Sequence, residues 1–312
     1  MATSTKRRKT QRVDIYAQVT NRIIEQLEQG VRPWLKPWHA EHAAGRITRP
    51  LRHNLTPYSG INILMLWASA QEQGFATPIW LTFKQVKELG GNVCKGSKGS
   101  PVVFASTFKR SEESEAGDEV EKDIPFLKQY TVFNAEQCEG LPSHFHELET
   151  QTHDEPLQPI QAAKEFFSAT GATIKHGGNR ACYSMASDHI CMPDLQTFTD
   201  AESYSAILAH EVTHWTRHPS RLARDLGRKR WGDEGYAMEE LVAELGSAFL
   251  CADLGITPEV RDDHASYIAS WLEVLKRDKR AVFSAASMAS RAVDYVHSLQ
   301  PALAAAELEE VQ

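Results

Sequence analysis

The stretch Ala209–Leu222 reads AHEVTHWTRHPSRL, and it predicts both the fold and the chemistry of the C-terminal half of the chain. His210 and His214 are four residues apart, so on a helix their imidazoles share one face, with Cβ atoms about 5–6 Å apart. Two such imidazoles can bind one metal ion. Glu211 then points beside the ion, where it can deprotonate a water molecule. The HExxH pattern therefore predicts a metal-dependent hydrolytic site on a helix.

A third histidine, His218, follows at the same spacing. On a straight helix it lies about 12 Å from His210 along the axis, at about 1.5 Å per residue, which is too far to share an ion. Pro219 disfavours helical geometry at His218, so the chain could turn there. In the metzincin pattern the third histidine would stand where this chain has Ser220. We therefore expect His218 not to bind the metal. It is expected instead to interact with the C-terminal end of the helix dipole, to contact one of the metal-binding residues, or to contact the substrate.

A better third ligand lies in YAMEELVAEL, Tyr236–Leu245, on the next predicted helix. This pattern resembles the gluzincins and related zincins, in which a glutamate on the second helix completes the site. That resemblance makes Glu240 the ligand and Glu244 a group that hydrogen-bonds a ligating histidine. Glu239 is the nearest alternative ligand. An exposed acidic helix face would also contain these three glutamates without any metal.

Zinc is the default ion for two histidines and a glutamate with an open position, and Mn²⁺ or another divalent ion is the alternative. The implied reaction is peptide hydrolysis, with Glu211 as the base. Tyr204, Tyr236 and His218 are the candidates for stabilising the oxyanion, and the sequence does not choose among them.

Charge is distributed unevenly along the 312 residues, whose net charge is −7. Residues 1–110 hold 17 Lys and Arg against 6 Asp and Glu, whereas residues 111–312 hold 17 against 35. A basic half indicates a polyanionic partner, although it could also simply dock on the acidic half.

In the basic half, cations alternate with aromatic rings, a combination suited to single-stranded nucleic acid, in which phosphates meet cations and unpaired bases stack on rings. Trp34 and Trp38 lie in the proline-broken segment RPWLKPW, and we expect them to be exposed stacking rings. The candidate DNA-binding residues are Arg32, Trp34, Lys36, Trp38, Arg49, Arg52, Tyr58, Lys84, Lys95 and Lys98.

Caps, breakers and periodicity predict an α+β protein with two domains. Residues 1–12 form a disordered basic tail, residues 13–141 a DNA-binding domain and residues 142–312 a zincin-like metallopeptidase domain with an antiparallel sheet. Residues 92–106 are expected to form a hairpin, and residues 111–123, which include seven acids, a mobile loop. Capping boxes are expected at Thr82 and Thr199. Helices are expected over residues 14–29, 58–73, 82–89, 160–170, 236–253, 263–277 and 280–298, and a further helix is expected to begin at Thr199 and carry His210 and His214, with His218 at its C-terminal end.

The five cysteines are widely spaced and form no CxxC pair, which favours a reducing compartment. No apolar stretch approaches the length of a membrane span, and the N-terminus has no apolar core of a secretory signal. These features predict a cytoplasmic protein without membrane contact.

Several motifs in order carry a more specific resemblance: GVRPWLKPW, YSGINILML, PIWLTFKQVKELGGNVCKGSKGSPVVF, YTVFNAEQCEGLP, and HEVTHWTRHPSRL with EELVAELGSAFL. Together they resemble the ArdC antirestriction proteins, whose N-terminal module also occurs in TraC-type primases. The resemblance implies single-stranded DNA binding, a zincin-like domain, and protection of incoming conjugative DNA from host restriction.

Three functions are compatible with the sequence. The first is a DNA-binding metalloprotease that acts on a protein related to restriction. The second is a DNA-binding shield whose metal site is structural or vestigial. The third is a nucleic-acid-processing enzyme, which the absence of a nucleotide-binding loop and of paired polymerase carboxylates disfavours. Glu211 favours the first function, because a structural site needs no base.

Overall fold

The computed structural model describes residues 14–34, 48–113, 119–145, 158–227, 234–256 and 264–301. The expected N-terminal tail falls outside these ranges. The helices are α1 (Ile15–Glu28), α2 (Ile61–Gln73), α3 (Phe83–Glu88), α4 (Gln158–Ala169), α5 (Ala201–Trp215), α6 (Glu234–Leu254), α7 (His264–Arg277) and α8 (Ala281–Ser298). The strands are β1 (Leu51–Arg52), β2 (Ile79–Thr82), β3 (Asn92–Val93), β4 (Ser100–Glu113), β5 (Glu119–Asn134), β6 (Cys138–Glu139), β7 (Ile174–His176), β8 (Cys182–Ser184) and β9 (His189–Met192).

Helix starts follow local capping rules. The side chain of Asp14 accepts a hydrogen bond from the Ala17 amide and begins α1, as predicted. Thr82 and Gln85 form the predicted capping box of α3. Helix α2 begins only at Ile61, because Gly60 precedes it with a positive φ of 60°.

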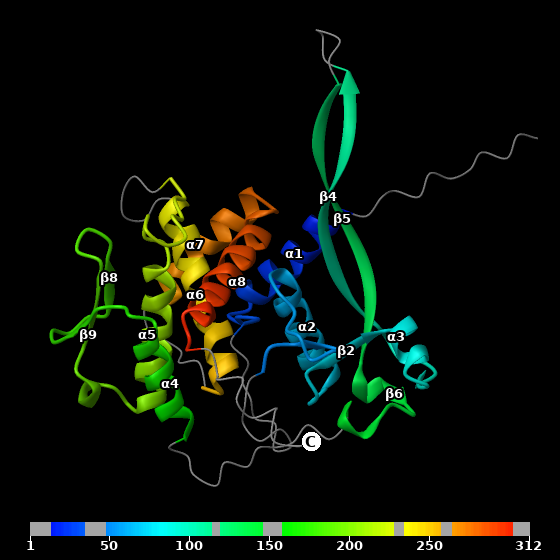
Figure 1. Ribbon diagram of the computed structural model, residues 1–312, viewed down its shortest axis with the longest axis horizontal. Coiled ribbons are helices and arrows are strands. Elements are labelled where there is room, and N and C mark those ends of the chain that lie inside the picture. Colours follow the sequence, from blue (N-terminus) through cyan, green and yellow to red (C-terminus); the bar gives the residue numbers. More distant parts are fainter. Residues whose placement is uncertain are drawn as a thin grey trace, which may run out of the picture.

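The first sheet corrects the predicted hairpin over residues 92–106. Its strand order is β1-β2-β5-β4, and β3 pairs with β6 instead of β4. Strands β3 and β6 have two residues each, which is too short for an alternating pattern to identify the partner strand. The four-stranded sheet lies beside α2, as Figure 1 shows.

The acidic stretch 111–123 was expected to be a mobile loop, which is wrong for most of its length. Strand β4 continues to Glu113, and β5 begins at Glu119, with Glu113 paired to Glu119. The two strands form a long ribbon that projects from the body of the molecule (Figure 1). In the ribbon the backbone groups of the two strands pair with each other, so most of this stretch extends the sheet instead of forming a loop.

The second sheet has the order β7-β9-β8. Strand β7 runs parallel to β9 and only β8 is antiparallel to it, which corrects the predicted all-antiparallel sheet. Helix α5 is capped by Asp200, whose side chain accepts from the Ser203 amide at 2.7 Å, instead of by Thr199. Figure 1 shows this small sheet at the edge of the molecule, next to α5.

One hydrophobic core joins the two halves of the chain. The Trp67 ring on α2 meets Phe249 on α6 edge to face, with centroids 5.8 Å apart, and Tyr16 on α1 meets Phe283 on α8 at 4.7 Å. Buried residues of α1 and α2 therefore belong to the same cluster as those of α5 to α8. The mixed helices and separate sheets confirm the α+β class. Among the described residues, no helix is both long and apolar enough to cross a membrane.

Helices α5 and α6 approach each other closely at Gly246. A Cβ atom at this position would lie 2.5 Å from Cγ2 and 2.7 Å from Oγ1 of Thr213. Beside it, the Ser247 hydroxyl donates to the Ala206 carbonyl at 2.9 Å, which ties the two helices together. Only a residue without a side chain permits this spacing.

We therefore predict that Gly246→Ala separates α5 from α6 and lowers the free energy of unfolding by about 1–3 kcal/mol, a typical cost of overpacking. Urea unfolding monitored by circular dichroism measures the loss. Combining it with Thr213→Ala, which removes both clashing atoms, should recover most of the stability. A single Gly246→Ala variant as stable as the parent would contradict the close packing.

Candidate metal centre

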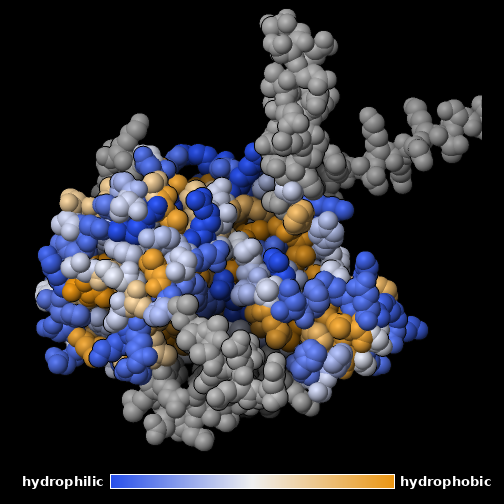
Figure 2. Space-filling model, viewed as in Figure 1, coloured by the Kyte–Doolittle hydropathy of each residue, from blue (hydrophilic) through white to orange (hydrophobic). Residues whose placement is uncertain are grey.

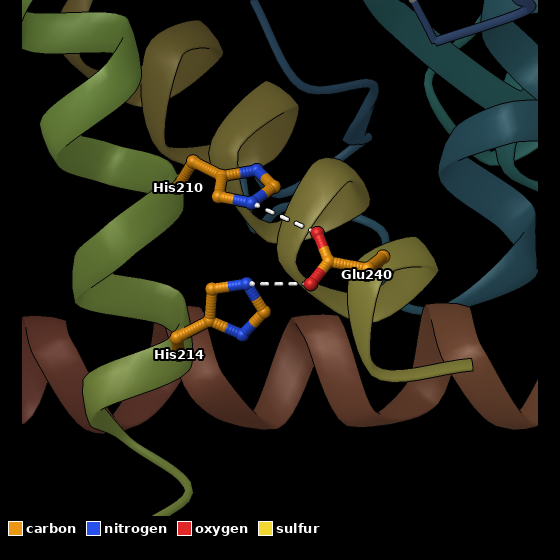
Figure 3. A group of neighbouring side chains, drawn as sticks. All are labelled: His210, His214 and Glu240. Carbon is orange, nitrogen blue, oxygen red and sulfur yellow. Dashed lines mark ion pairs between the residues drawn. The ribbon is translucent and has the colours of Figure 1, made fainter. Parts of the chain in front are cut away.

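His210 and His214 on α5 face Glu240 on α6, and Figure 3 shows the carboxylate beside the two rings, with one oxygen directed at each. The Nε2 atom of each imidazole lies 3.6 Å from a different oxygen of Glu240. Within the part of the chain that the structure describes, these three residues offer ligand atoms that all lie within 4.8 Å of one another. All three side chains are largely shielded from solvent.

Each histidine has a second carboxylate behind it. Nδ1 of His214 lies 3.0 Å from Oε1 of Glu239, and Nδ1 of His210 lies 3.9 Å from Oε2 of Glu244. A carboxylate behind Nδ1 holds the tautomer in which Nε2 presents its lone pair to an ion. Glu239 was the rival ligand in the sequence, but its carboxylate lies behind His214, at Nδ1, and does not face both Nε2 atoms.

Glu239 is itself held by Arg224, a residue that the sequence did not single out. The guanidinium donates 2.7 Å hydrogen bonds to both oxygens of Glu239, and it also donates to the Thr213 carbonyl and the Thr216 hydroxyl. Arg224 lies in the loop after α5, directly after Ala223, whose backbone has a positive φ of 48°. No signal in the sequence indicated this pair, because the burial of Glu239 and its contact with an arginine 15 residues earlier appear only in the folded chain.

Electrostatics follow from this packing. Burial lowers the pKa of His214, but Glu240 and Glu239 outweigh it and raise the pKa to about 10. Burial raises the pKa of Glu239, but hydrogen bonds from Arg224 and His214 lower it to about 2. Burial also raises the pKa of Glu240, and the two histidines bring it well below its usual range. Glu239 and Glu240 are therefore ionised at neutral pH.

A cavity of about 700 Å³ opens on these residues. Glu211 and Tyr236 line it together with the three clustered side chains, and β8 contributes Cys182 and Tyr183 to its wall. Because β8 is an edge strand of its sheet, one side of its backbone faces away from β9. The cavity is therefore bordered by a carboxylate, a phenol and a strand edge.

Arg221 fixes β8 relative to the end of α5. Its guanidinium donates to the Tyr183 hydroxyl and to both oxygens of Asp188, and it stacks over the Trp215 ring at 4.0 Å. The HPSRL segment therefore does more than end the active-site helix, because it anchors one wall of the cavity.

Among the described residues, His218 is not a member of the cluster formed by His210, His214 and Glu240. It follows the end of α5, and its Nδ1 lies 2.7 Å from the Ser220 hydroxyl. Neither His218 nor Tyr204 is among the described residues that line the cavity, and Tyr204 instead pairs with His176 at 2.8 Å. Of the three candidates for oxyanion stabilisation, Tyr236 is the one that the fold places in the cavity.

The structure corrects the expected roles of four DNA-binding candidates. Trp34 is 1% exposed, so the expectation of an exposed stacking ring is wrong, and Tyr58 is also buried. Arg32 pairs with Glu244 at 3.1 Å, and Arg49 pairs with Asp253 at 2.5 Å. The sequence could not reveal these roles, because the acidic partners are more than 200 residues away along the chain.

Other candidates remain available to a ligand. Arg52, Lys84, Lys95 and Lys98 are exposed, and Arg52 lies over the Tyr58 ring with 5.3 Å to its centroid. Lys36 and Trp38 fall outside the described residues.

Exposed aromatic rings that were not among the sequence candidates lie on α3 and the ribbon. Phe83 is 54% exposed, Phe104 51% and Tyr130 39%. Phe104 and Tyr130 meet edge to face at 6.4 Å, and Lys128 lies 5.0 Å from the Tyr130 centroid. Over β2, α3 and β6, hydrophobic and hydrophilic residues lie side by side on the surface (Figure 2).

We predict that Arg224→Met destabilises the fold by about 3–5 kcal/mol, because it leaves the Glu239 carboxylate buried without its cation. The folded pKa of Glu239, about 2, lies below its ordinary value of 4.5, so its contribution to stability is present above pH 4.5 and lost as pH falls through 2. In Arg224→Met the pKa rises, and acid unfolding should begin at higher pH. Thermal unfolding with a chelator present, from pH 3 to pH 7, tests this. If the melting temperature falls with decreasing pH in the same way in Arg224→Met as in the parent, the proposed role of Arg224 is contradicted.

Comparisons with known proteins agree with this architecture. Residues 13–133 match the model of the N-terminal domain of anti-restriction factor ArdC, and residues 161–288 match a zincin-like metallopeptidase model. A protein named y4eC from Sinorhizobium fredii is 41% identical over 92% of both chains. A DNA primase TraC of Escherichia coli is 38% identical over 90% of this chain, which spans 27% of that primase.

Solved structures are similar as well. The metal-free crystal structure of the antirestriction protein ArdC from plasmid R388 is 45% identical, with a TM-score of 0.77 over 92% of this chain and 98% of that one. Its Mn(II)-bound structure gives a TM-score of 0.75 at 44% identity and the same coverage. By sequence, domain content and fold, this chain belongs to the ArdC antirestriction family.

Proposed function

We propose that this chain is an antirestriction protein that binds single-stranded DNA through its N-terminal half and hydrolyses a protein at a divalent metal centre in its C-terminal half. The observation that carries the enzymatic part is the pair of imidazole Nε2 atoms facing one carboxylate, with Glu211 in the same cavity. A wholly structural site has no use for that glutamate or for an open cavity beside it.

The donor set fits a divalent first-row ion. Two imidazole nitrogens and one carboxylate would supply three ligands to the ion, and carboxylates behind both Nδ1 atoms support this ligation. Zn²⁺ and Mn²⁺ both suit these donors, and the related R388 protein has a Mn(II)-bound structure. When bound, such an ion lowers the pKa of water and polarises a carbonyl group.

The protein groups supply the remaining chemistry. The Glu211 carboxylate takes a proton from the attacking water and can return it to the leaving amine. Tyr236 donates a hydrogen bond to the developing oxyanion, since burial and the adjacent Tyr267 hydroxyl raise its pKa well above the usual range and keep it protonated. An extended peptide can pair with the free edge of β8, which places its backbone along the cavity.

Single-stranded DNA is the proposed ligand of the N-terminal half. Exposed cations follow phosphates, while rings exposed on α3 and the ribbon stack on bases without a strong sequence preference. The burial of Trp34 and Tyr58 moves the proposed stacking role to Phe83, Phe104 and Tyr130. Arg52, Lys84, Lys95, Lys98 and Lys128 are the proposed phosphate-binding residues.

We predict that Glu211→Gln abolishes protection from restriction while metal content stays at the parental level. Removing a general base typically costs about 10²–10⁴-fold in rate. The measurement is conjugation efficiency into recipients with and without a restriction system, together with metal analysis by mass spectrometry. Glu273→Gln, an exposed change on α7, is the matched control. Full protection by Glu211→Gln would instead support a DNA-binding shield without proteolysis.

We also predict that Phe104→Ala with Tyr130→Ala weakens oligonucleotide binding by about 1–3 kcal/mol for each stacked base that is released. Lys95→Gln with Lys98→Gln should instead reduce the salt dependence, by about 0.7 in the log–log slope for each phosphate that is no longer neutralised. Fluorescence anisotropy with a labelled oligonucleotide at several salt concentrations measures both. Lys175→Gln, exposed on β7, is the control. Binding by the parent that does not weaken with salt would refute the electrostatic part.

A further inference from the structure

The segment Arg32–Trp34 belongs to the N-terminal half but reaches the outer shell of the metal centre. Nη1 of Arg32 donates to Oε1 of Glu244 at 3.1 Å, and Nε1 of Trp34 donates to the same oxygen at 3.2 Å. All three side chains are buried. Because both donors bind Oε1, they determine how the Glu244 carboxylate is oriented.

The other oxygen of Glu244 is directed at His210. Oε2 lies 3.9 Å from Nδ1 of His210, and Nε2 of the same ring lies 3.6 Å from Glu240. Nδ1 of His210 is buried and has no hydrogen-bond partner at these distances. A shift of about 1 Å would bring Oε2 within the 2.7–3.2 Å of an ordinary hydrogen bond. Glu244 is therefore positioned to accept a hydrogen bond from Nδ1 of His210.

The two histidines depend on different parts of the chain. His214 is supported by Glu239, which Arg224 holds from the loop directly after α5. His210 is supported by Glu244, which is held by residues more than 200 positions earlier in the sequence. One side of the site is thus built within the C-terminal half, whereas the other side requires the N-terminal half.

Trp34 is also connected to a residue that lines the cavity through a column of rings. It meets Trp271 edge to face at 5.7 Å, Trp271 stacks on Tyr267 at 6.2 Å, and the Tyr267 hydroxyl lies 3.0 Å from that of Tyr236. Tyr236 lines the cavity. A single indole therefore contacts both the support of His210 and the ring column that ends at Tyr236.

We propose that Arg32 and Trp34 are positioning residues of the metal centre, acting on His210 through Glu244, so that the site is completed by the N-terminal half of the chain. The proposal rests on the proposed metal binding. Outer-shell groups of this kind contribute about 10–100-fold to metal affinity. Since these residues act one contact further out than Glu244, we expect effects near the lower end of that range.

The test measures Zn²⁺ and Mn²⁺ affinity of the full chain by chelator competition. Trp34→Phe removes the indole donor and keeps a ring against Trp271, and Arg32→Gln removes the cation. Each should weaken binding about 10-fold. Arg32→Lys, which keeps the charge, should bind more tightly than Arg32→Gln. Unchanged affinity in both Trp34→Phe and Arg32→Gln would overturn the proposal.

Arg49→Gln is the matched control. Arg49 also comes from the N-terminal half and forms a buried ion pair with α6, at Asp253, but neither residue contacts a clustered histidine. It should lose thermal stability and keep its metal affinity. If Arg49→Gln weakens metal binding as much as Arg32→Gln, the effect is general destabilisation and the proposal fails.

A double-mutant cycle tests the route through Glu244. In a Glu244→Gln background, Trp34→Phe and Arg32→Gln should cause no further loss of affinity, because the carboxylate that they orient is absent. Fully additive losses would show that they act by another path. Failure of the proposed function would give a different result. If the parent chain binds neither ion, or if the His210→Ala variant binds the ions as tightly as the parent does, there is no metal centre at these residues.

Discussion

The arrangement of the site depends on how closely α6 packs against α5. At Gly246 the absence of a side chain lets the helix backbone approach Thr213, and nearby on the same helix the carboxylate of Glu240 faces both His210 and His214. Side-chain reach is short compared with the distance between loosely packed helices, so a carboxylate can face both imidazoles only if the helices nearly touch. Close packing of α5 against α6 is therefore a condition for forming the metal centre.

Around this pair of helices, charge is balanced in layers. The central carboxylate faces two imidazoles, each imidazole has a carboxylate behind it, and each of those carboxylates is held by an arginine. Burying so many ionisable groups is costly unless every one is paired. The pairs also fix orientation. Because Arg32 and Trp34 both donate to one oxygen of Glu244, the other oxygen of this carboxylate is directed at His210. The same contacts that stabilise the fold thus orient the site.

The basic half has a different organisation from the one that its composition suggests. Some of its cations are used inside the protein, since Arg32 and Arg49 both pair with acids on α6. The positive charge of the N-terminal half therefore has two origins. Some cations dock this half on the acidic half, and others form a surface that is available to polyanions. The docking explanation of the charge asymmetry holds for the two buried arginines. Exposed lysines and the rings of the ribbon are what remains for the proposed DNA ligand.

By itself the sequence determined the local features: most helices, the caps at Asp14 and Thr82, the α+β class, and the family, which ordered motifs identify. It also predicted that His210, His214 and Glu240 would meet, because helical spacing and a resemblance to zincins need no long-range detail. Tertiary structure decided the rest. Which strand pairs with which, which aromatic rings are buried, and which arginine holds which glutamate depend on residues far apart in the chain. Periodicity reports only the face on which a residue lies, not the partner that it meets there.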